Sequence, residues 1–130
     1  MCTGPSTFCA SLLTTADDQH LFSGHGAGYV AINRTRYQTS VLVTPTSVAE
    51  WVIRSFADLN ARSLEAALEL QPDVLILGTG RMMRFPPRET MEAVSAAGVG
   101  LEVMDTGAAC RTYNILAAEG RKVAAAILVE

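Results

Sequence analysis

The stretch that most constrains this chain is residues 73–81, which read DVLILGTGR. Four apolar residues follow one another here with no polar residue between them, and a Gly-Thr-Gly sequence comes directly after them. An uninterrupted apolar run predicts a strand that is covered on both faces, which is typical of a parallel sheet between helical layers. We therefore expect a buried strand that ends in a glycine-containing loop.

Downstream of this strand, segments of helical pattern alternate with apolar segments. The expected order is a helix from Pro86 to Gly98, a strand over 99–104, a helix that Asp105 or Thr106 caps and that ends near 120, and a strand over 123–129. Both connections are long enough for the crossover that parallel neighbours require. These residues predict a βαβαβ parallel unit with right-handed crossovers.

The first half of the chain has a period of two residues, which indicates strands with one buried face. Residues 28–43 predict two strands joined by a turn at 33–35, and residues 48–53 predict a third strand. A helix capped by Asn60 then precedes Pro72. The expected fold class is therefore α/β, with an N-terminal antiparallel β meander before the parallel unit.

Residues 1–19 show no sustained period, and we expect them to form a flexible arm. Residues 20–130 then form a single α/β domain, in keeping with a chain of 130 residues. No apolar run approaches the length that spans a bilayer, and no basic segment precedes the apolar patch near the N-terminus. We expect a soluble, cytoplasmic protein without a membrane span.

The composition argues against nucleic acid as a partner. The net charge is −3 and the sequence pI is about 5.3, whereas non-specific binding to nucleic acid depends on a basic surface. Only 18% of the residues are charged, and this low density is consistent with a protein partner or with a self-associating face. We therefore keep a homo-oligomer among the hypotheses.

The loops at the carboxyl ends of parallel strands line the ligand crevice of such sheets. The expected crevice is formed by Gly78, Thr79, Gly80, Arg81, Arg84, Asp105, Thr106, Arg111 and Asn114. Glycine amides, arginine side chains and helix N-termini favour an anion such as phosphate or carboxylate. In the alternative interpretation, the glycines only turn the chain, and the arginines pair with Glu89, Glu92 or Asp105.

Several catalytic and cofactor motifs are incomplete. Met83 stands where a dinucleotide fingerprint has its third glycine, and no Lys-Ser/Thr pair completes a P-loop. Cys110 has no histidine in its half of the chain and is expected to be buried and inert. His20 and His25 have no carboxylate or thiolate company, so we expect exposed histidines and no metal site. No cofactor and no catalytic residue is predicted, and whether the chain is an enzyme stays open.

Several segments together resemble a small domain-of-unknown-function family. The resemblance is carried, in order, by Leu77-Gly78-Thr79-Gly80-Arg81, Arg84-Phe85-Pro86-Pro87, Glu102-Val103-Met104-Asp105-Thr106, residues 108–116 and Glu119-Gly120-Arg121. Animal members of this family include mitochondrial respiratory complex I assembly factor three and an adipogenesis-associated protein. The likeness covers about residues 20–130, and the absence of a mitochondrial targeting segment suggests a bacterial member.

The resemblance implies a three-layer (β+α)/β/α sandwich and brings no established catalytic activity. Our leading hypothesis is a non-catalytic partner-binding or assembly-type domain with a polar crevice at the carboxyl edge of the sheet. The rival hypothesis is a small enzyme or binding protein for an anionic metabolite in the same crevice, with Arg81, Arg84 and Thr106 as contacts.

Overall fold

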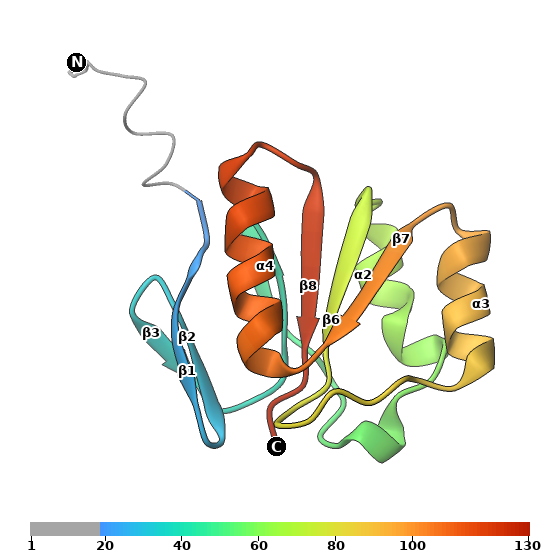
Figure 1. The fold of residues 1–130 in the computed structure, drawn as a ribbon, viewed down its shortest axis with the longest axis horizontal. Coiled ribbons are helices and arrows are strands. Elements are labelled where there is room, and N and C mark those ends of the chain that lie inside the picture. The colour runs from blue at the N-terminus through green and yellow to red at the C-terminus, as the bar shows by residue number, and fades with distance from the viewer. Residues whose placement is uncertain (1–18) are drawn as a thin grey trace.

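The computed structural model describes residues 19–130 (Figure 1). In chain order the elements are β1 (Phe22–Gly26), β2 (Tyr29–Ile32), β3 (Thr35–Tyr37), β4 (Val41–Thr44), β5 (Ser47–Glu50), the short 3-10 helices η1 (Phe56–Asp58) and η2 (Arg62–Leu64), α2 (Glu65–Glu69), β6 (Val74–Gly78), α3 (Arg88–Ala96), β7 (Gly100–Met104), α4 (Thr106–Ala118) and β8 (Val123–Ile127). No helix within residues 19–130 combines the length and apolar character needed to cross a membrane.

The central sheet contains five strands in the order β5-β4-β8-β6-β7. Strand β6 pairs in parallel with β7 on one side and with β8 on the other, so that Leu77 lies opposite Val103 and Ala126. Strand β4 joins β8 in the antiparallel direction. The chain leaves β6 for β7 and then returns across β6 to β8, so the strand order reverses at β6. Such a reversal opens a crevice at the carboxyl ends of the strands.

Two layers cover the central sheet, as Figure 1 shows. Helix α4 and the antiparallel sheet β1-β2-β3 lie on one face, and α2 and α3 lie on the other. Ile76 belongs to the core cluster on the α4 side, whereas Leu75 and Leu77 belong to the cluster on the α3 side. Successive residues of a strand point to opposite faces. The apolar run in β6 therefore has both faces buried, and the expected three-layer (β+α)/β/α sandwich is confirmed.

The N-terminal half differs from the expected single meander, because its five strands belong to two sheets. The predicted turn is present at Asn33 and Arg34, whose positive φ angles of 48° and 74° suit a tight hairpin. The predicted strand up to residue 43 is interrupted at 38–40, where the chain passes into the central sheet. Both sheets bury one face, so an alternating pattern does not reveal which sheet a strand joins.

One further expectation from the N-terminal half needs correction. The strand expected over 48–53 ends at Glu50, and Trp51 turns inward, where its indole N–H donates to the Ser63 carbonyl at 2.7 Å. The expected arm, residues 1–19, lies outside the described residues except for Gln19, whose side-chain amide donates to the Ala117 carbonyl at 3.2 Å.

Two side chains of α4 attach the small sheet to the rest of the domain. The Asn114 carboxamide accepts from the Phe22 N–H and donates to the Phe22 carbonyl, both at 2.8 Å. The Tyr113 hydroxyl donates to the His20 carbonyl at 2.8 Å, and its ring meets the Phe22 ring edge to face at 5.3 Å. Asn114 thus makes the hydrogen bonds with Phe22 that the backbone of a neighbouring strand would otherwise make.

We expect Asn114→Ala to lower the free energy of unfolding by about 1–3 kcal/mol, because both backbone groups of Phe22 lose their partner in a half-buried position. Urea denaturation measures this change. The control is Ile115→Ala at the adjacent, 59% exposed position, which should change stability much less. Equal losses in the two variants would contradict the anchoring role of Asn114.

Candidate functional site

The ends of β6, β7 and β8 meet at one corner of the central sheet, where Thr106 connects them. The Thr106 hydroxyl accepts from the Gly80 N–H at 3.1 Å and lies 3.3 Å from the Leu128 carbonyl, to which it donates. The Thr106 N–H in turn donates to the Gly80 carbonyl at 2.8 Å. The loop after β6, the start of α4 and the segment after β8 therefore share one set of hydrogen bonds.

Helix α4 approaches this corner closely because Gly78 has no side chain. A Cβ built on Gly78 would lie 3.1 Å from the Ala109 Cβ, which leaves no room for a larger residue without movement. The Asp105 carboxylate accepts from the Ala108 N–H at 2.9 Å, as the predicted N-cap requires. The start of α4 is therefore held against the end of β6.

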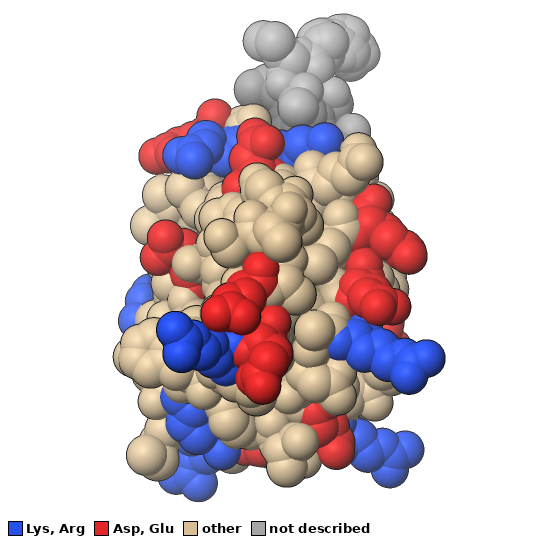
Figure 2. All heavy atoms as spheres, turned by 90° about the vertical axis from the view of Figure 1, so that its right-hand side faces the viewer, with Lys and Arg blue, Asp and Glu red and all other residues tan. Residues whose placement is uncertain are grey.

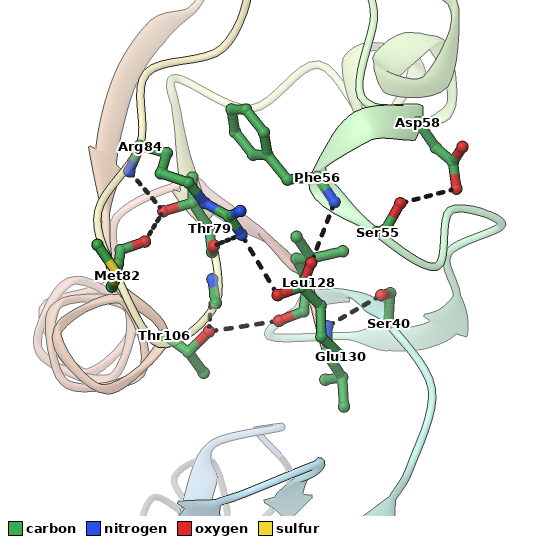
Figure 3. A network of polar contacts seen from close by, with 12 residues as sticks. Ser40, Ser55, Phe56, Asp58, Thr79, Met82, Arg84, Thr106, Leu128 and Glu130 are labelled. Carbon is green, nitrogen blue, oxygen red and sulfur yellow. Dashed lines mark hydrogen bonds and ion pairs between the residues drawn. The ribbon is translucent and has the colours of Figure 1, made fainter.

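Thr79 fixes the conformation of the loop between β6 and α3 (Figure 3). Its buried hydroxyl donates to the Met82 carbonyl at 2.8 Å and accepts from the Arg84 N–H at 3.0 Å. The Arg84 guanidinium donates a hydrogen bond to the Thr79 carbonyl at 2.8 Å. These bonds close the loop on itself in a single compact turn.

Arg84 also joins this loop to the segment after β8 and to η1. Its guanidinium lies 3.3 Å from the Glu130 carboxylate and stacks over the Phe56 ring at 4.4 Å. The second Glu130 oxygen accepts from the Phe56 N–H at 3.2 Å (Figure 3). Both charged side chains are 38% exposed, so the ion pair itself adds little stability. Its main effect is to hold the Arg84 guanidinium at Glu130 and Phe56.

A cavity of about 490 Å³ opens beside this corner, between the β1-β2 hairpin and the N-terminal end of α4. It is lined by His25, Gly26, Ala27, Gly28, Tyr29, Gly80, Arg81, Asp105, Thr106, Gly107, Arg111, Leu128, Val129 and Glu130. The cavity lies at the carboxyl end of β6 and β8, where the reversal of strand order places a crevice.

The side chains of His25 and Arg111 line the cavity and lie close to Gly107. A Cβ built on Gly107 would lie 3.0 Å from His25 Cε1 and 3.5 Å from Arg111 Nη1. The absence of a side chain at this position therefore lets an imidazole and a guanidinium approach the first turn of α4. Within residues 19–130, no group of three or more His, Cys, Asp or Glu side chains is placed to hold a metal ion.

The structure places the sequence-predicted crevice residues in three groups. Gly80, Arg81, Asp105, Thr106 and Arg111 line the cavity. Gly78 and Thr79 are buried behind it, and Arg84 is turned toward Glu130. Asn114 lies away from the cavity, because both ends of its amide bind β1.

The sequence analysis missed the contribution of the β1-β2 hairpin to this cavity. His25 was expected to be exposed, and it is, but its ring also forms part of the cavity wall. The only sequence signal was the pair of glycines that flank residues 25–27, which indicates a turn and not a binding residue. The approach of this hairpin to α4 is a tertiary contact that no local pattern contains.

Cys110 is buried on the inner face of α4, with 3% of its surface exposed. Burial raises the pKa of the Cys110 thiol to about 12, with Arg111 acting in the opposite direction and Asp105 adding to the increase. The thiolate is the reactive form of cysteine, and its population at neutral pH is negligible when the pKa is this high. The position is therefore unsuited to nucleophilic catalysis.

We expect iodoacetamide to leave Cys110 unmodified in the native protein. The experiment uses a Cys2→Ser/Cys9→Ser background, so that Cys110 is the sole thiol. Alkylation followed by mass spectrometry across a urea titration should rise with global unfolding, because the raised pKa and burial both suppress the native reaction. Rapid alkylation without denaturant would contradict this account.

Thr79 and Thr90 form a matched pair that tests the role of the buried hydroxyl in the loop. Both residues are 1% exposed, but the Thr90 hydroxyl has no hydrogen-bond partner among the described residues. We expect Thr79→Val to destabilise the fold by about 1–3 kcal/mol and to speed amide exchange at Arg84, since the Arg84 N–H loses its acceptor. Thr90→Val should be neutral or slightly stabilising. The same cost for both substitutions, measured by denaturation, would exclude the loop-closing role of Thr79.

The fold and the crevice define a small three-layer α/β domain with a polar corner at the carboxyl edge of its sheet. The family model described as a protein of unknown function (DUF498/DUF598) matches residues 22–128, and the chain belongs to this family. The resemblance expected from the segments between Leu77 and Arg121 is thereby confirmed.

Relatives and solved structures agree with this assignment. NADH dehydrogenase (ubiquinone) 1 alpha subcomplex assembly factor 3 of Danio rerio is 36% identical over 88 residues, or 66% of this chain and 51% of the relative. The 13 kDa major membrane protein of Francisella tularensis is 28% identical over 109 residues, which cover 82% and 89% of the two chains. A crystal structure from Bordetella parapertussis superposes with a TM-score of 0.82 at 40% identity, covering 86% of this chain and 97% of that one. This chain spans about half the length of the assembly-factor relatives.

Proposed function

We propose that this chain is a non-catalytic, assembly-type domain that binds a protein partner at the carboxyl edge of its sheet. The relatives named as complex I assembly factors support an assembly role. The observation that carries the proposal is the loop between β6 and α3. It exposes three large apolar side chains within four residues: Met82 is 69% exposed, Met83 47% and Phe85 65%.

The loop is held in a defined conformation although its apolar side chains face water. The Thr79 and Arg84 hydrogen bonds fix its backbone, so the exposure does not come from a loosely ordered chain. Exposed apolar side chains that cluster in this way are typical of interaction surfaces. Full burial of such a side chain from water is worth roughly 1.5–3 kcal/mol, and burying the exposed part of each against a partner would contribute a corresponding share of the binding free energy. A preformed loop also reduces the ordering entropy that binding must overcome.

Flexible methionines and an aromatic ring suit such a surface. Methionine adapts to irregular partner surfaces, and aromatic residues are enriched in the buried centre of interfaces. The cationic side chain of Arg88 lies in the same segment of sequence, and its ion-pair partner among the described residues is the exposed Glu92 at 3.3 Å. Figure 2 shows basic side chains on both sides of the lower end of the face that carries α3, with uncharged surface and acidic side chains between them. We therefore propose a partner segment that is apolar with acidic flanks.

The test is affinity purification from the source cell at native expression. We expect the wild-type chain to recover subunits of a respiratory NADH dehydrogenase, and Met82→Ser/Met83→Ser/Phe85→Ser to lose them through at least a tenfold weaker affinity. The control is Ile115→Ser, which removes a 59% exposed apolar side chain from the outer face of α4 and should keep the partner.

Two outcomes would count against this proposal. Equal recovery by the wild-type chain and the loop variant would exclude the loop as the docking surface. Light scattering of the purified chain addresses the homo-oligomer hypothesis: a dimer that the loop substitutions dissociate would show that the loop binds a second copy of this chain. The loop variant should keep the wild-type unfolding midpoint, because none of the three side chains is buried.

A further inference from the structure

The cavity beside Gly107 carries a chemistry that the docking loop does not use. Three cationic or potentially cationic side chains, His25, Arg81 and Arg111, line it together. The two ion pairs among residues 19–130 join Arg84 to Glu130 and Arg88 to Glu92, so neither Arg81 nor Arg111 has a carboxylate partner there. Two unpaired guanidinium groups at one cavity favour an anion.

We propose that this cavity is a binding site for a small organic carboxylate, held by Arg81 and Arg111 with His25 as an additional contact. The site is separate from the docking function, because Met82, Met83 and Phe85 do not line the cavity. If the carboxylate site is disproved, the proposed partner-binding role is therefore unaffected. If the partner-binding role is disproved, the carboxylate site is likewise unaffected.

The charges at the cavity fit a monoanion better than a phosphate dianion. The Asp105 carboxylate also lines the cavity, although it caps α4 by accepting from the Ala108 N–H. The Glu130 carboxylate is engaged by Arg84 and by the Phe56 N–H. Counting the side chains of Arg81, Arg111 and Asp105 alone, two guanidinium groups and one carboxylate leave one net positive charge. The thirteen-residue helix α4 adds the positive end of its dipole at the same place.

The walls of the cavity provide space and apolar surface for the organic part of a ligand. A volume of about 490 Å³ is in the range of small-molecule sites and exceeds what an inorganic anion fills. Leu128 and Val129 contribute apolar lining, and the Tyr29 ring forms a side wall. This ring packs against Gly26 on one side, and Arg36 stacks over it at 3.8 Å. The aromatic wall is thus held in place before any ligand enters.

The hairpin and the helix start also allow a ligand to approach the backbone closely. Gly26 ends β1, Gly28 lies in the hairpin turn, and Gly107 lies in the first turn of α4. The Gly107 N–H has no acceptor among the described residues, whereas the Thr106 and Ala108 amides are engaged by Gly80 and Asp105. A carboxylate between Arg81 and Arg111 is therefore expected to accept a hydrogen bond from this amide as well.

The test is an NMR titration of the isotope-labelled full chain at constant ionic strength with three probes: sodium benzoate, benzamide and inorganic phosphate. Benzoate and benzamide share a ring that suits the Tyr29 wall and differ in the charge of the head group. We expect benzoate to shift the amide signals of Gly26, Gly28, Gly80 and Gly107 in a saturable way. Benzamide should shift them far less, and phosphate should bind more weakly than benzoate.

Matched variants connect this response to the two arginines. We expect Arg81→Gln and Arg111→Gln each to raise the Kd for benzoate roughly tenfold, since each removes a charge-assisted contact. Arg121→Gln removes the same charge beyond the opposite end of α4 and should leave the Kd unchanged. All three positions are exposed, so the variants should fold like the wild-type chain.

Any of three results would overturn the proposal. The first is equal shifts with benzoate and benzamide, which would mean a purely apolar cavity. The second is an equal loss of affinity in Arg121→Gln, which would mean non-specific attraction by net charge. The third is a response that does not fit a carboxylate site. Either the four glycine amides show no saturable shifts, or phosphate binds more tightly than benzoate.

Discussion

The hydrogen bonds of Thr106 are the constraint on which the rest of the carboxyl edge depends. One hydroxyl and one N–H connect the loop after β6, the start of α4 and the segment after β8. The strand order reverses at β6, so these three segments reach the same corner from different parts of the chain. With this corner fixed, Arg81 and Arg111 can line one cavity although they lie thirty residues apart in the sequence.

The same corner separates two kinds of surface that lie close together. Thr79 and Arg84 hold the loop after β6 so that its apolar side chains point into solvent, whereas the cavity on the α4 side keeps its cationic groups unpaired. A partner that covers the loop would therefore lie near the mouth of the cavity.

The sequence was most informative where local pattern and burial agree. The apolar run of β6, the Asp105 cap and the helix-terminating role of Gly98 and Gly120, both with positive φ, follow from local chemistry. The assignment of strands to two sheets does not, because residues 38–40 carry no signal for the change of sheet. The same limit applies to the candidate site. The loops after β6 and β7 could be identified from the sequence, whereas the contribution of His25 depends on packing between distant elements. Asn114 was expected in the crevice, but its partner is the backbone of β1.

The attachment of β1 to α4 has a consequence for how this family can diversify. Asn114 and Tyr113 bind backbone carbonyl and N–H groups, which every residue except proline provides. The hairpin can therefore accept new side chains at its tip without losing its anchor. Because the tip forms one wall of the cavity, substitutions there would change the shape and charge of that wall while the scaffold stays the same.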